Sequence, residues 1–125
     1  MKFAKNLKKF AICLFLMLFF CFSFSTCARQ LLDNQLLFGI QAARQDLWDE
    51  AIFRWKKVVL SDPNSAAAHN NLAVAYEKKG LWEEAKNEYE IALKLNPGNA
   101  QIKANYQNFN KNSEPFNKYK KDEKN

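Results

Sequence analysis

Few side chains in this sequence are suited to catalysis or to metal binding. His69 is the only histidine among the 125 residues, and all three cysteines precede residue 28. Beyond that point the chain can form no disulfide and offers no thiolate to a metal. The adjacent carboxylates Glu83 and Glu84 suit the first turn of a helix, where the helix dipole favours negative charge, better than an acid–base pair. We therefore expect no enzymatic activity, no cofactor and no metal ion.

Cys27 is placed where a covalent modification is expected. The N-terminal letters MKFAKNLKK carry four lysines and no acid, and the next fifteen residues, FAICLFLMLFFCFSF, are uncharged. A basic segment followed by an apolar run is typical of a secretory signal. The residues Phe24-Ser25-Thr26-Cys27 resemble a relaxed lipobox of bacterial lipoproteins, with Phe24 and Thr26 departing from the usual pattern. That resemblance implies cleavage before Cys27 and lipidation of its thiol.

Two other fates of this segment remain open. Residues 10–28 number 19, close to the roughly 20 that span a bilayer as a helix, so the segment can also remain as an uncleaved anchor. Ordinary signal peptidase could instead cut after Ala28 and release the chain. Each alternative places residues 29–125 in the bacterial cell envelope, on the outer side of the inner membrane, in the periplasm or at the surface.

The net charge of +6 resides at the two ends of the chain. Residues 1–27 hold four lysines and no acid, and residues 111–125 hold five lysines and three acids. Residues 28–110 therefore contain ten basic and ten acidic side chains. A balanced central region lacks the electrostatic footprint of a phosphate-binding surface, so no nucleic acid is expected as a partner.

The chain repeats itself with a period of about 34 residues, so that segments 32–65 and 66–99 superimpose. Matching positions are Gly39 with Ala73, Trp48 with Trp82, Ala51 with Ala85, Trp55 with Tyr89, and Pro63 with Pro97. Each segment is expected to form two amphipathic helices joined by a turn and ended by a proline, which lacks an N–H group.

The second segment resembles the tetratricopeptide-repeat (TPR) family over its whole length. Its small residues Ala73, Ala85 and Ala92, its aromatic residues and its terminal Pro97 match that pattern. The first segment departs at three positions, with Ala42 in place of an aromatic residue, Asp46 in place of glycine and Val58 in place of alanine. The resemblance implies an all-α fold, an α-solenoid of two helix-turn-helix hairpins.

The chain is expected to divide into a signal or anchor segment, a TPR domain and a tail. Residues 1–27 are the signal peptide or anchor helix, and residues 28–111 form the TPR domain. Within this domain, Ile102, Tyr106 and Phe109 share one face of an expected capping helix over residues 100–111. Residues 112–125 are charged and rich in turn-forming residues, so we expect a disordered polar tail.

The resemblance also implies a concave groove lined by the first helix of each hairpin, which binds a protein or an extended peptide. The residues expected there are Leu36, Leu37, Ile40, Arg44, Asn70, Asn71, Val74, Lys78, Asn105 and Asn108. Asn71 and Asn105 lie one repeat period apart, and their amides can both donate to and accept from a peptide backbone. Leu36 and Ile40 stand where carboxylate-binding relatives carry Lys and Asn, so a C-terminal acidic peptide is not expected.

A second contact surface is expected at Ile52 and Phe53, because the matching residues of the second hairpin are the polar Lys86 and Asn87. This surface could mediate homo-oligomerisation or docking of the N-terminal segment. The expected function is that of an envelope-anchored scaffold or adaptor that binds a protein partner. The alternative is an accessory subunit that presents a small solute to a membrane transporter.

Overall fold

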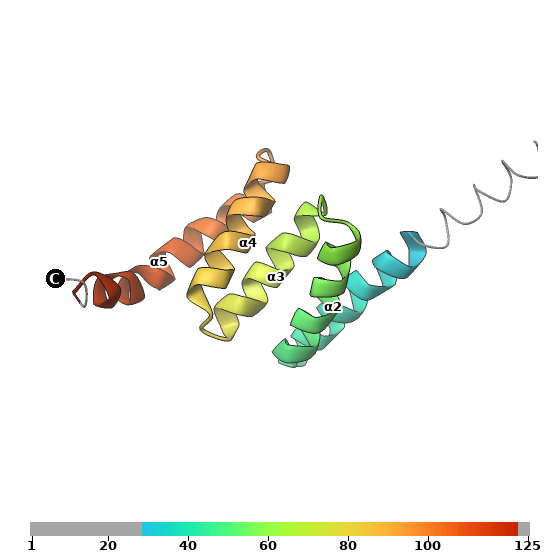
Figure 1. Cartoon of the computed structure of the whole chain (residues 1–125), viewed down its shortest axis with the longest axis horizontal. Helices are drawn as coiled ribbons and strands as arrows, with labels where there is room; N and C mark the ends of the chain where they lie inside the picture. The colour runs from blue at the N-terminus through green and yellow to red at the C-terminus, as the bar shows by residue number, and fades with distance from the viewer. Residues whose placement is uncertain (1–28, 123–125) are drawn as a thin grey trace, which may run out of the picture. The chain divides into compact units, whose positions relative to one another are not determined.

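The computed structural model of the chain describes residues 29–122, with side chains as far as Glu114. The chain divides into two units, Met1–Asn34 and Gln35–Asn125, and the packing below concerns the second. Its elements are a helix over residues 29–44, α2 (Trp48–Ser61), α3 (Ala66–Lys78), α4 (Trp82–Leu95) and α5 (Ala100–Asp122), with no strand in this range. From α2 onwards each helix packs against the next along the chain (Figure 1). The described fold is all-α, as expected.

The turns inside the two hairpins are repeated at matching positions. The Leu47 N–H donates to the Ala42 carbonyl at 3.0 Å, and the Leu81 N–H donates to the Tyr76 carbonyl at 2.9 Å. The entries into α3 and α5 match as well: the Ser65 hydroxyl accepts from the Ala68 N–H. In the same place, the Asn99 side chain accepts from the N–H groups of residues 101 and 102. These side chains satisfy N–H groups that have no partner within the first helical turn.

Asp46 adopts the backbone conformation that glycine adopts in the second hairpin. Its φ is 57°, and that of Gly80, at the matching position, is 72°. The left-handed region suits glycine and is visited by aspartate and asparagine at some cost. The departure from the family pattern at Asp46 therefore leaves the turn intact, and the first hairpin closes in the same way as the second.

Replacing Asp46 with glycine is expected to raise the free energy of unfolding by about 0.5–1 kcal/mol, because glycine relieves the left-handed strain at a smaller entropic cost. Urea unfolding monitored by circular dichroism measures the change. The opposite substitution, Gly80→Ala, should lower stability by about 1 kcal/mol through the backbone alone. A Cβ at Gly80 would meet no atom within 4 Å, so steric contact does not complicate that comparison. Equal stability of all three proteins would contradict the strain argument.

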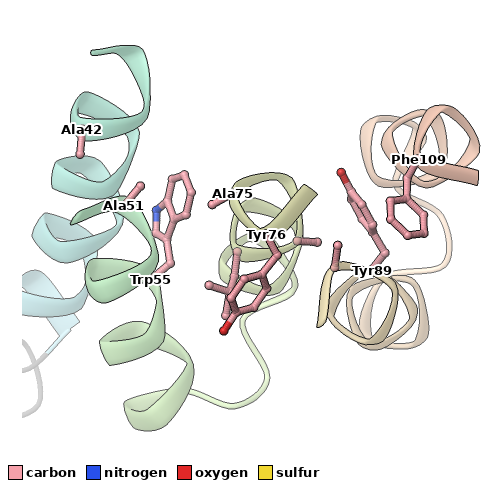
Figure 2. Packing of buried hydrophobic residues seen from close by; sticks show 10 residues of the cluster. Ala42, Ala51, Trp55, Ala75, Tyr76, Tyr89 and Phe109 are labelled. Carbon is pink, nitrogen blue, oxygen red and sulfur yellow. The ribbon is translucent and has the colours of Figure 1, made fainter. Parts of the chain in front are cut away.

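The core alternates alanines with large rings. Ala51, Ala73, Ala85 and Ala92 are fully buried, which lets neighbouring helices approach closely. In Figure 2 the Trp55 ring lies between α2 and α3, beside Ala75. The rings of Tyr89 and Phe109 lie next to each other between α4 and α5. Burial, reinforced by the negative charge of Glu77, raises the pKa of Tyr89. Its neutral hydroxyl donates to that carboxylate at 3.0 Å.

His69 is a structural residue of this core. Its side chain is buried, with Nε2 3.0 Å from the Pro63 carbonyl oxygen and Nδ1 2.5 Å from Glu88 Oε2. A carbonyl oxygen can only accept, so Nε2 carries a proton and donates it to the loop between α2 and α3. These contacts join the start of α3 to that loop and to α4.

α5 closes the C-terminal end of the stack and is longer than expected. Ile102 and Phe109 are buried and Tyr106 is partly buried, which confirms the apolar face expected for the capping helix. The disordered tail expected from residue 112 is wrong for residues 112–122, which continue the helix. The physical reason is that contacts extend another turn: Ser113 is 2% exposed, and the Asn112 amide donates to Glu77 at 3.0 Å. Residues 123–125 lie outside the described part.

The expected signal or anchor helix over residues 1–27, and with it Cys27, lies outside the described residues. Between residues 29 and 122, no helix combines the length and the apolar character needed to cross a bilayer.

Candidate functional site

A hollow of about 380 Å³ opens where the helix over residues 29–44, α3 and α5 approach one another beside α2. Its lining residues are Ile40, Ala43, Arg44, Trp48, Trp55, Asn70, Asn71, Val74, Gln101 and Asn105. Six of them, Ile40, Arg44, Asn70, Asn71, Val74 and Asn105, are residues that the sequence places in a groove. The first helices of both hairpins and the capping helix thus contribute to one concave site.

Four expected groove residues do not line this hollow. The side chain of Leu36 packs against the core, and its carbonyl oxygen accepts from Trp55 Nε1 at 3.2 Å. Leu37, Lys78 and Asn108 are exposed outside the lining. Lys78 lies one helical turn beyond Val74, and Asn108 lies about 60° around α5 from Asn105 at 100° per residue. The repeat spacing preserves the face of a helix but does not fix where along that face the hollow ends.

Three asparagines of the hollow form a chain of hydrogen bonds among themselves. Asn105 Nδ2 donates to Asn70 Oδ1 at 3.0 Å, and Asn70 Nδ2 approaches Asn71 Oδ1 at 3.4 Å. Asn70 is only 5% exposed, so its amide joins α3 to α5 instead of facing a ligand. Within the described part, the side-chain oxygen Asn105 Oδ1 and the side-chain nitrogen Asn71 Nδ2 make no hydrogen bond. One acceptor and one donor are thereby left at the edge of the hollow.

Comparison with known proteins identifies the second hairpin. Residues 66–99 match the family model described as "Tetratricopeptide repeat". The second hairpin is a tetratricopeptide repeat. A related sequence, the mouse protein named Protein O-mannosyl-transferase TMTC4, is 44% identical over 50 residues. This stretch is 40% of the present chain and 7% of the mouse protein, so the chain spans a small fraction of that relative's length.

The TPR assignment accounts for the form of the hollow. TPR hairpins stack so that their first helices line a concave surface, and the repeat at residues 66–99 contributes Asn70, Asn71 and Val74 from its first helix. The first hairpin shares the same turn hydrogen bonds and the same spacing of buried residues. The repeat at residues 66–99 suggests a protein-interaction module.

The lining of the TPR hollow is apolar along one wall and carries a single charge. Trp48 and Trp55 lie two turns apart on α2 and, together with Ile40, Ala43 and Val74, form the apolar wall. Arg44 is the only charged lining residue, and no carboxylate lines the hollow. Its side chain is exposed at the rim. The site therefore favours a ligand that presents apolar groups together with a negative charge.

Sequence reasoning missed Ala43, Trp48, Trp55 and Gln101 among the lining residues. Gln101 lies four residues before Asn105 on the same face of α5, so helical spacing contained the signal for it. Trp48 and Trp55 match Trp82 and Tyr89 of the second repeat, and Trp55 is 3% exposed, as a core residue is. Trp48 instead is partly buried, with part of its surface open to the hollow.

At the expected second contact surface, Ile52 and Phe53 differ in exposure. Ile52 is partly buried and packs against the core, whereas Phe53 is 49% exposed. The two residues are adjacent in α2, about 100° apart around the helix axis, so one turns inward as the other turns outward. Phe53 alone presents apolar surface at this position.

Proposed function

We propose that this chain is an envelope-anchored adaptor that binds an extended segment of a partner protein in the TPR hollow. The observation that carries the proposal is the lining of the hollow, which combines an apolar wall, two available amide groups and one arginine in a concave surface. Extended peptides offer unpaired backbone groups, which amide side chains satisfy, and alternating side chains that enter pockets.

The chemistry of the hollow defines the segment it would take. The Asn105 oxygen accepts from a backbone N–H of the segment, and the Asn71 amino group donates to a backbone carbonyl oxygen. An apolar side chain lies against the wall formed by Trp48 and Trp55, where burial of its surface contributes most of the affinity. An acidic side chain, placed nearby within the same segment, pairs with Arg44 at the rim.

The sequence supports anchoring in a bacterial-type envelope. Its basic start and uncharged apolar run favour export, and Cys27 is the candidate lipidation site. An uncleaved anchor helix would place the TPR hairpins on the same side of the membrane. In both forms the adaptor holds its partner close to a bilayer.

We further propose that the chain acts by binding and not by catalysis. In the described residues no three His, Cys, Asp or Glu side chains gather to hold a metal ion, and the one histidine is occupied in the core. The transferase activity named for the mouse relative belongs to a protein of which the match covers 7%. The 50-residue match, together with the repeat at residues 66–99, supports an interaction module.

The test of this function uses Arg44 and Lys78, which occupy matching repeat positions and are both exposed cations on first helices. Extended peptides that bind the full chain in detergent are selected from a random displayed library. Their affinities for the variants are then measured by fluorescence anisotropy. Arg44→Ala is expected to weaken binding about three- to tenfold, equivalent to about 1 kcal/mol for a partly exposed ion pair. Lys78→Ala, outside the hollow, should leave the affinity unchanged.

The selected sequences supply a second criterion. Enrichment of an acidic residue beside an apolar one supports the proposed segment. Equal losses in the two variants would place binding outside the hollow. If no peptide is enriched at all, the adaptor function is contradicted and the solute-presenting alternative becomes the one to pursue.

A further inference from the structure

The exposed apolar side chains of the described residues are concentrated in the N-terminal half of this range. Apart from Leu81, every large apolar side chain that is at least 39% exposed precedes residue 61. These residues are Leu31, Leu37, Phe38, Leu47, Phe53 and Leu60. α5 contributes none as far as Glu114, whereas the first hairpin exposes several.

Comparison with the second hairpin shows which of these exposed apolar residues a TPR hairpin does not need. Phe38 matches Leu72, which is 2% exposed in the core and lies on α3, a helix that packs against α2. The helix over residues 29–44 has no preceding hairpin among the described residues, which leaves Phe38 49% exposed. On the second helices, Phe53 and Leu60 match the exposed polar residues Asn87 and Lys94. A TPR hairpin therefore does not need apolar residues at these two positions.

Cations lie directly on these aromatic rings. The guanidinium of Arg54 is 5.7 Å from the ring centres of both Phe38 and Phe53, and the Lys57 ammonium is 4.4 Å from the Phe53 ring. Arg54 is paired with Glu50, but within the described part no carboxylate pairs with Lys57. Phe53, Lys57 and Leu60 follow one another at i, i+4 and i+7 along α2 and so share one face. We call Phe38, Phe53, Arg54, Lys57 and Leu60 the aromatic face.

We propose that the aromatic face rests on an anionic lipid surface. Exposed apolar tips beside cations are what an interfacial surface requires, because the rings enter the headgroup region as the cations meet lipid phosphates. The inference rests on the proposed membrane anchoring. Phe38 follows Ala28, the end of the uncharged run, by only ten residues, which even fully extended reach about 35 Å. A chain held in the membrane at that run keeps the aromatic face near the bilayer.

Charge favours a lipid surface over a second copy of the chain. A twofold contact through this face would bring together two Lys57 side chains, neither of which is paired with a carboxylate among the described residues. Like charges brought together in a desolvated contact are unfavourable, whereas a phosphate-bearing surface neutralises both. The cations of the aromatic face thus favour an anionic surface as its occupant.

The test places a photo-crosslinking residue on the aromatic face and at its match in the second hairpin. The full chain, carrying either Phe53→p-benzoylphenylalanine or Asn87→p-benzoylphenylalanine, is reconstituted into vesicles of phosphatidylcholine and phosphatidylglycerol. Sedimentation first establishes that the chain is held by the membrane, and mass spectrometry then identifies the photoproducts. We expect lipid adducts at position 53 that exceed those at position 87 at least fivefold. Adding Lys57→Glu should reduce them severalfold.

Each other outcome overturns the inference in a recognisable way. A product of doubled mass at position 53 identifies a second copy as the occupant, and a crosslink to residues 1–28 identifies the chain's own N-terminal segment. Equal lipid adducts at positions 53 and 87 mean that the membrane does not contact the aromatic face in preference to the matching face of the second hairpin. A membrane-held chain without lipid adducts refutes this contact but leaves the anchoring intact, whereas a chain that does not sediment refutes both. Peptide binding at Arg44, measured separately, is not affected by either probe.

Discussion

Replacing Phe109 with alanine is expected to lower the free energy of unfolding by about 3–5 kcal/mol, the typical loss when a buried phenylalanine is truncated. Phe109 is 1% exposed, and its ring centre lies 5.3 Å from that of Tyr89, 6.1 Å from Trp82 and 6.2 Å from Tyr106. Removing it leaves a cavity between α4 and α5 that the surrounding rings cannot fill. Since small domains are stable by only about 5–15 kcal/mol, the midpoint of thermal unfolding should fall by more than about 10 °C.

The loss should begin at the C-terminal end of the stack. Hairpins in a solenoid contact only their neighbours, so weakening the α4–α5 contact opens α5 before the first hairpin. Native-state hydrogen exchange measures this order directly, with early exchange in α5 and retained protection in α2. Phe53→Ala is the matched control, because Phe53 is 49% exposed and its loss should change stability by less than about 0.5 kcal/mol. Similar losses in both variants would show that α5 is not the cap.

The repeat made most of the fold predictable from the sequence. Its spacing aligned Pro63 with Pro97 and Ala51 with Ala85, and in the structure the second helix of each hairpin ends two residues before the proline and buries the alanine. Periodicity worked here because every helix buries one face, so apolar spacing reports directly on packing. The extent of α5 was not predictable, because residues 112–122 are helical despite a polar composition. The contacts of Asn112 and Ser113 that extend the packing are tertiary and leave no periodic signal.

The candidate site was predictable as a surface but not in its hydrogen bonds. Periodicity placed Asn70, Asn71 and Asn105 on first-helix faces, and all three line the hollow. It could not show that Asn70 and Asn105 bond to each other, since this depends on the distance between α3 and α5. The consequence is practical. Replacing Asn105 with alanine would leave the nearly buried Asn70 oxygen without its partner, so it would test stability together with binding. Arg44, which makes no such contact among the described residues, tests binding alone.

Replacing Gly39 with alanine is expected to lower the free energy of unfolding by about 1–3 kcal/mol, the usual cost of overpacking a core. Gly39 lies inside the helix over residues 29–44, where helix propensity alone would make alanine more stable by about 1 kcal/mol. Its added Cβ would, however, contact Trp55 Nε1 and lie 2.6 Å from Trp55 Cε2. The indole cannot easily move away, because it is 3% exposed and donates to the Leu36 carbonyl. Urea unfolding therefore decides between two effects of opposite sign.

The second repeat suggests how this clash can be relieved. There Ala73 takes the place of Gly39 and Tyr89 takes the place of Trp55. The second repeat thus combines alanine with tyrosine, whose ring is smaller than the indole that accompanies glycine in the first. Combining Gly39→Ala with Trp55→Tyr should therefore cost at least about 1 kcal/mol less than the sum of the two single losses, as expected for residues in contact. Gly98→Ala is the control, since its Cβ would meet only the Asn96 side chain, at 4.0 Å. Strict additivity in this cycle would mean that the pair does not compensate in volume, and that the two hairpins pack their first helices differently.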